Sequence, residues 1–360
     1  MGKAFMKGSL VLEEKVGVRF FSALFPFSWR TLLFFDLFLL AVLILATRLA
    51  TFLHELIGHA LVASAFGGEV NGVRMSLFGG GHVYYFLSRE SGLFVRLLVA
   101  FGGIIVNMLS GLLLFIFIRK PDKRSGWAFF PILFGMVSLL GAITYCALGF
   151  YYDHGDPVAW ADRASPYVGW FSVPFLVVSP FVSCFALKAY SIINEVWFPT
   201  KTYLGRVVML ILTLGLTGGA YAGLFWLTDQ RSVALDAPLS AYQRAEEDVR
   251  KWKVEELFGN LRESHPQLSK TEIQRLVERT PIVVNPDEVP KKFPLKPVIA
   301  ILYAAGALLA LRGMREGVPD AHPWVDTRSF VIAVALAVAV LGALVMSGGW
   351  VYRSVHWLPG

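Results

Sequence analysis

Long apolar stretches separated by short polar segments dominate the chain. Six of the stretches are long enough to cross a bilayer as a helix, since a span needs about 20 mostly apolar residues, and a seventh is shorter. The seven stretches lie at residues 31–53, 93–118, 127–150, 168–190, 205–227, 297–311 and 329–350. The pattern predicts an all-α polytopic membrane protein with about seven transmembrane helices.

Composition supports a membrane protein rather than a soluble one. Of the 360 residues, 56% are hydrophobic and 16% are charged, whereas soluble domains average about 45–50% and about 25%. The formal net charge of +7 is the kind of excess that membrane proteins place in cytoplasmic loops. We therefore expect the lipid bilayer as the surroundings of the chain and no nucleic-acid partner.

Polar composition divides the chain into four parts. Segment 228–296 has 12 Lys/Arg and 12 Asp/Glu. It also has a capping box at Ser269 and Glu272, which is typical of a helix start. We therefore expect a small helical extramembrane segment here. The expected parts are an N-terminal interfacial or cytoplasmic segment (1–30), a membrane core with five spans (31–227), the extramembrane helical insert (228–296), and two C-terminal spans with a tail (297–360).

The Lys/Arg distribution in the short loops predicts the orientation. With seven spans, 15 of these side chains fall on the N-terminal side and 5 on the other. Cytoplasmic loops carry the excess of Lys and Arg. We expect the N-terminus in the cytoplasm, and the C-terminus and segment 228–296 on the opposite side.

Candidate chemistry lies at the end of the first apolar stretch, in the sequence His54-Glu55-Leu56-Ile57-Gly58-His59. Polar groups in a membrane helix are costly unless something offsets them. A metal ion would do so, with two imidazoles as ligands and a glutamate to take a proton from water. Arg48, two helical turns before Glu55, is expected to pair with a carboxylate or a lipid headgroup.

The spacing of the two histidines requires a local helix defect. Zinc motifs of the HExxH type place their histidines at i and i+4, whereas His54 and His59 are five residues apart. On a regular α-helix the two side chains would point about 140° apart. A π-type turn reduces this angle to roughly 50°, and Gly58 tolerates the distortion. We therefore predict a π turn or a break within 54–59.

Residues 31–160 resemble the site-2 protease family of intramembrane zinc metalloproteases (peptidase family M50). The resemblance rests on HELIGHALVASAFGG as an HExxGH variant of the first motif, and on FGGIIVN, where Gly103 and Asn107 match a later glycine–asparagine signature with Ile104 in place of the usual proline. The family's β-hairpin corresponds to 67–86, which alternates before a Gly79-Gly80-Gly81 turn and a β-prone end.

The resemblance implies a set of site residues. His54 and His59 would be metal ligands and Glu55 the catalytic general base. The family's third ligand is an aspartate at the end of a later span, for which Asp156 is favoured over Asp153. Asp153, His82 and Asn107 remain alternatives as a further ligand or a substrate contact.

The resemblance further implies a membrane-embedded zinc metallopeptidase. With Zn²⁺ as cofactor, it would cleave membrane-anchored protein or peptide substrates, unwound into a strand beside the 67–86 hairpin. Two other functions remain open: a non-catalytic membrane scaffold or binding protein on a decayed protease core, and a metal-dependent lipid hydrolase.

Overall fold

The computed structural model describes residues 29–88, 91–117, 126–152, 155–158, 168–197, 203–236, 241–284, 295–312 and 327–353. The N-terminal segment expected at 1–30 falls almost wholly outside these ranges. Two compact units are separated by their internal contacts: Val233–Leu295 forms one, and the rest of the chain forms the other.

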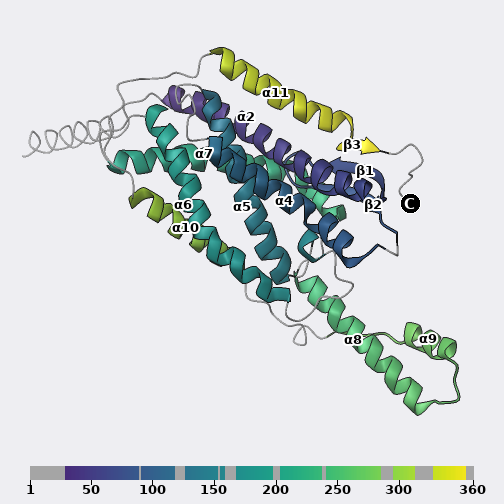
Figure 1. Ribbon diagram of the computed structural model, residues 1–360. Coiled ribbons are helices and arrows are strands. Elements are labelled where there is room, and N and C mark those ends of the chain that lie inside the picture. The colour runs from purple at the N-terminus through teal and green to yellow at the C-terminus, as the bar shows by residue number, and fades with distance from the viewer. Residues whose placement is uncertain are drawn as a thin grey trace, which may run out of the picture. The chain divides into compact units, whose positions relative to one another are not determined.

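Long apolar helices make up the larger unit, as the sequence predicts (Figure 1). Within the described residues, six helices are long and apolar enough to cross a membrane, and a shorter apolar helix covers Leu295–Ala310. The helices are α2 (Trp29–Phe52), α4 (Leu93–Phe117), α5 (Phe129–Tyr152), α6 (Ser172–Trp197), α7 (Tyr203–Asp236), α10 (Leu295–Arg312) and α11 (Thr327–Met346).

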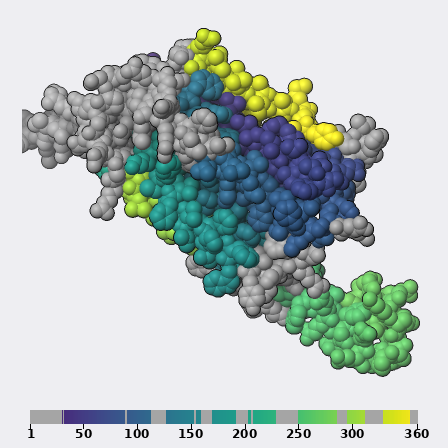
Figure 2. Space-filling model, in the orientation of Figure 1, coloured from purple at the N-terminus to yellow at the C-terminus, as the bar shows by residue number. Residues whose placement is uncertain are grey.

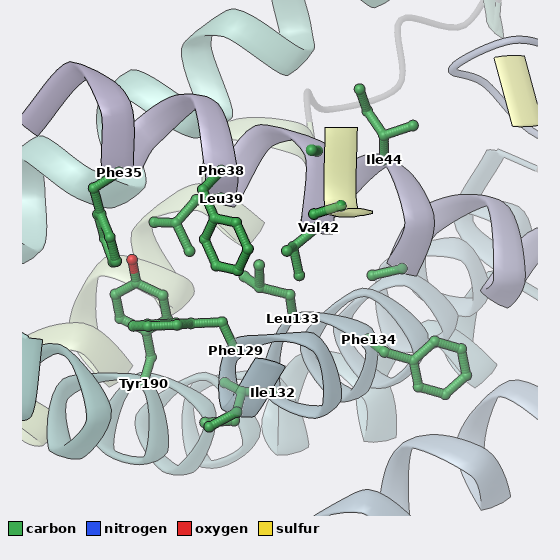
Figure 3. Packing of buried hydrophobic residues seen from close by; sticks show 14 of the residues in the cluster. Phe35, Phe38, Leu39, Val42, Ile44, Phe129, Ile132, Leu133, Phe134 and Tyr190 are labelled. Atoms are coloured by element: carbon green, nitrogen blue, oxygen red, sulfur yellow. The ribbon is translucent and has the colours of Figure 1, made fainter. Parts of the chain in front are cut away.

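Helix α2 lies at the centre of the main hydrophobic core. Its buried face, which includes Phe38 and Val42, packs with α5, α6, α7 and α11, and part of this packing is visible in Figure 3. Phe35 meets Phe129 of α5 edge to face. Helix α11 lies along α2 at the surface, yellow beside purple in Figure 2. This packing fixes the direction of the helix that carries the histidine motif.

The expected hairpin is present, but it belongs to a three-stranded sheet. Strand β1 (Glu69–Met75) pairs antiparallel with β2 (Gly81–Phe86). Its other edge pairs antiparallel with β3 (Trp350–Arg353), which follows α11. The strand order is β2-β1-β3. The sequence does not predict this third strand: Trp350 is the final residue of the apolar stretch 329–350, and the other three strand residues lie in the segment expected as the tail.

Two helices make up most of the smaller unit. They are α8 (Ala241–Ser264) and α9 (Lys270–Arg279). The predicted capping box begins α9, because Ser269 and Glu272 each bond to the other's backbone amide. Ile273 and Val277 of α9 are buried. The amphipathic pattern of the sequence is thus sufficient to predict this short helix.

Candidate metal centre

The predicted π turn is confirmed between α2 and the short helix α3 (Val62–Ala65). Residues Leu53–Leu61 form a π-helix, η1, with the histidine motif inside it. Its wider turn brings the rings of His54 and His59 to a centroid distance of 4.9 Å. The motif has one more residue between its histidines than HExxH, and the wider turn of the π-helix accommodates this extra residue.

Three side-chain atoms converge at this point. Nε2 of His54 lies 3.2 Å from Nε2 of His59. Oδ2 of Asp156 lies 3.2 Å from the first nitrogen and 3.1 Å from the second. Ligand atoms around a tetrahedral zinc ion are about 3.3–3.6 Å apart. The donor set and its spacing therefore fit a zinc ion, with a fourth position left for water.

Helix α4 orients both imidazoles. Nδ1 of His59 donates to the carbonyl of Val99 at 2.6 Å, so the Nε2 lone pair points to the cluster. Nδ1 of His54 lies 3.1 Å from Nδ2 of Asn107, while the buried Oδ1 of Asn107 has no partner among the described residues. An asparagine amide has nearly the same shape in either orientation. Turned over, its oxygen accepts the Nδ1 proton and frees Nε2 of His54 as a ligand.

Glycines allow α4 to approach the π-helix this closely. A Cβ on Gly103 would lie 2.5 Å from Nε2 of His54, and a Cβ on Gly58 would collide with the backbone of Gly103. The glycine–asparagine signature thus has a geometric reason. Gly103 admits the imidazole, and Asn107 contacts that ring from the same helix.

Glu55 is buried beside the cluster and faces the start of β2. Its side chain has a relative exposure of 6%, and the backbone amide of Gly81 donates a hydrogen bond to it. A Cβ on Gly81 would lie 2.5 Å from Cγ of Glu55. The glycine turn therefore allows the main chain to contact the carboxylate directly.

Asp156 reaches the cluster from a short 3₁₀ turn after α5, Asp156–Val158. Gly155 before it has φ +70°, and the hydroxyl of Tyr145 accepts the Asp156 amide at 3.0 Å. Burial alone would raise the pKa of the Asp156 carboxyl, but in the metal-free site imidazoles of His54 and His59 that carry a proton on Nε2 outweigh it and hold that pKa below its usual range. A lowered pKa favours the ionised carboxylate, which is the form that can hold a metal ion.

Of the other candidates from the sequence, Asn107 contacts His54, and His82 lies outside the cluster. Asp153 lies outside the described residues. His82 is exposed on β2 and meets the ring of Tyr84 edge to face, outside the one group of potential metal ligands among the described residues. The alternation of the strand turns Tyr85 to the other face, where burial, and secondarily the charge of Asp156, raise the pKa of its phenol.

Comparison with known families gives one match. A family model described as Peptidase M50B-like matches residues 22–151. This part of the chain is M50B-like. No curated protein and no solved structure matches the chain. The M50B-like region includes α2, η1, the hairpin, α4 and nearly all of α5, and it ends before Asp156. The match therefore does not extend to Asp156, which the structure brings to the histidines.

Sequence reasoning missed several contacts of this site. Tyr145, Gly81 and the carbonyl of Val99 each contact a site residue from a separate segment. For Gly81, the glycine run in the turn was a usable signal. For Tyr145 the only signal was its position in the span that ends just before the aspartate.

Proposed function

We propose that the protein is a membrane-embedded zinc metallopeptidase that cleaves membrane-anchored peptides. The observation that carries the proposal is the convergence of His54, His59 and Asp156 to 3.1–3.2 Å beside the buried Glu55. That the site lies at the end of an apolar helix in an M50B-like region supports the same conclusion.

In this proposal the chain's own residues hold and move the proton. His54, His59 and Asp156 would hold Zn²⁺, which when bound supplies a Lewis acid that acidifies water and polarises the scissile carbonyl. Glu55 takes the proton of the attacking water and returns it to the leaving amine. The amide of Gly81 orients the Glu55 carboxylate, while Asn107 and the Val99 carbonyl set the imidazole tautomers.

The sheet order limits where a substrate strand can add. A peptide must be extended at the cleaved bond, and an exposed sheet edge can pair with an extended segment. Strand β3 already covers one edge of β1, so the available edge of the hairpin is that of β2. We place the substrate there, because β2 begins at Gly81, which contacts Glu55.

The test is Glu55→Gln, with Glu69→Gln as matched control. Glu69 is an exposed carboxylate on β1. Purified Glu55→Gln should keep the wild-type zinc content and lose about 10²–10⁴-fold in cleavage of a fluorogenic peptide with a leucine-rich membrane anchor, as expected for loss of a general base. Glu69→Gln should behave as wild type.

Three outcomes would overturn the proposal. Cleavage by Glu55→Gln at the wild-type rate would remove Glu55 from the chemistry. A wild-type protein without zinc would favour the scaffold, and a zinc protein that releases fatty acid from phospholipid vesicles, but no peptide product, would favour the lipid hydrolase.

A further inference from the structure

Arg48 is a buried cation near the end of a membrane-type helix. Its relative exposure is 4%, and it forms no ion pair with a carboxylate in the described part of the chain. The expected carboxylate partner is thus not what the structure gives. Instead Nη1 donates to the carbonyl of Ser76 at 2.6 Å and Nη2 to that of Gly79 at 2.7 Å. Both carbonyls belong to the turn between β1 and β2.

A second side chain holds the same turn from α7. The hydroxyl of Tyr221 donates to the carbonyl of Phe78 at 2.7 Å and accepts from Nη2 of Arg48 at 3.3 Å. Three carbonyls of one turn are therefore bound by two side chains from different helices. Five donors in a fixed planar fork suit Arg to this task better than Lys, whose ammonium is a point charge.

As a result, the carbonyl groups of the turn and its last amide face different partners. Its carbonyls at Ser76, Phe78 and Gly79 point to Arg48 and Tyr221, while the amide of Gly81 donates to Glu55. Arg48 and Glu55 lie seven residues apart on one continuous helix, about 10 Å along its axis. One end of the turn thus contacts the guanidinium of Arg48 and the other end contacts the carboxylate of Glu55. Both side chains belong to the same helix.

We propose that Arg48 and Tyr221 are positioning residues that hold the β1–β2 turn so that the Gly81 amide fixes the Glu55 carboxylate. The proposal rests on the proposed role of Glu55 as general base. It assigns Arg48 no contact with metal or substrate. We call the contacts of Arg48 and Tyr221 with the turn carbonyls the clamp. Loss of the clamp should impair turnover without releasing zinc, because neither Arg48 nor Tyr221 contacts His54, His59 or Asp156 in the described structure.

The experiment compares Arg48→Met, Arg48→Lys and Tyr221→Phe in the full-length zinc protein. The matched control is Arg96→Met, which removes an arginine bonded to the carbonyl of Ser91, away from the turn. For each variant we would measure zinc content, kcat and KM on the fluorogenic anchored peptide, and amide exchange of the 76–82 peptide.

Arg48→Met should keep the full zinc content. Its kcat should fall about 10–100-fold with little change in KM, as for other residues that orient a metal site. The amides of residues 76–82 should exchange faster than in the wild-type protein. Arg48→Lys should fall between Arg48→Met and wild type, and Tyr221→Phe should show a smaller loss of kcat and protection. Arg96→Met should match wild type in all readouts.

Three results for Arg48→Met would each contradict the proposed clamp. They are loss of zinc, an unchanged kcat in an active enzyme, and unchanged amide exchange of residues 76–82. If Arg48→Met does not fold, Tyr221→Phe decides by the same readouts. If the wild-type protein cleaves no peptide, the proposed function fails, and the exchange of 76–82 at constant zinc content still accepts or rejects the clamp.

Discussion

Gly81 is the residue at which the main chain meets the catalytic candidate. A side chain there would overlap Cγ of Glu55, so Gly81→Ala should displace the carboxylate while leaving the three proposed metal ligands in place. We expect full zinc content and a loss of at least about 10-fold in kcat. Gly80→Ala is the matched control, since a Cβ on Gly80 meets no atom within 4 Å. Equal activity of the two variants would contradict this role of Gly81.

Asn107 should act on zinc affinity rather than on turnover directly. Asn107→Leu leaves Nδ1 of His54 without an acceptor, and loss of such an outer hydrogen bond weakens metal binding about 10–100-fold. Asn107→Asp keeps an acceptor and should bind zinc nearly as well as wild type. Chelator competition measures both, with Ser110→Ala, one turn further along α4, as control. Wild-type affinity in Asn107→Leu would show that the contact does not orient the ring.

Residues close in sequence could be predicted, and residues brought together by the fold could not. His54, Glu55 and His59 stand within six positions, so their chemistry was readable directly. Asp156 depended on the family resemblance. No local pattern indicates that Gly81 donates to Glu55 or that Arg48 binds carbonyls, because these contacts depend on where the hairpin lies against α2 and α7.

At the scale of elements, strand β3 offers a test of where substrates add. Ending the chain after Met346 removes β3 and exposes the second edge of β1. Ladder hydrogen bonds and the packing of Trp350 over Gly72 are then lost, so the thermal midpoint should fall. Cleavage at low temperature should persist, because the β2 edge is unchanged. An inactive but folded, zinc-loaded truncation would instead place the substrate on the β3 side of the sheet.

The elements themselves differ in how far the sequence predicts them. Spans follow from apolar length alone, and α9 follows from its capping box and periodicity. The π-helix was predictable because His54 and His59 cannot share an ion otherwise, although its extent over Leu53–Leu61 was not. Strand β3 was missed because four residues that follow a membrane-type helix carry no strand signal until β1 lies beside them.

For the whole molecule, the directions of the helices favour seven crossings. Phe34 near the start of α2 stacks on Phe330 near the start of α11, and β3 after α11 reaches β1, so α2 and α11 run in parallel. Helix α7 also runs this way, since Thr217 contacts Asp36 and the later Tyr221 contacts Thr47. The chain must therefore cross back between α7 and α11, and α10 is the apolar helix that lies there.

Cysteine labelling tests this topology. In a background with Cys146 and Cys184 replaced by serine, Ser264→Cys should react with a membrane-impermeant maleimide in intact cells. Ser125→Cys and Val318→Cys should react only after permeabilisation, because the Lys/Arg bias places both loops in the cytoplasm. Labelling of Val318→Cys together with Ser264→Cys would mean that α10 does not cross. Reversal of all three would invert the predicted orientation.

The pairing of β3 with β1 also determines when, during synthesis, the sheet can finish folding. Val73 pairs with Tyr352, about 280 residues later in the chain, so the sheet beside Glu55 cannot close until α11, which precedes β3, has left the ribosome and entered the membrane. Contacts this distant in sequence form late. A chain interrupted before β3 would already hold the histidine motif but lack the finished sheet, so the newly made protein should acquire its full protease resistance only after Trp350–Arg353 has been made and paired with β1.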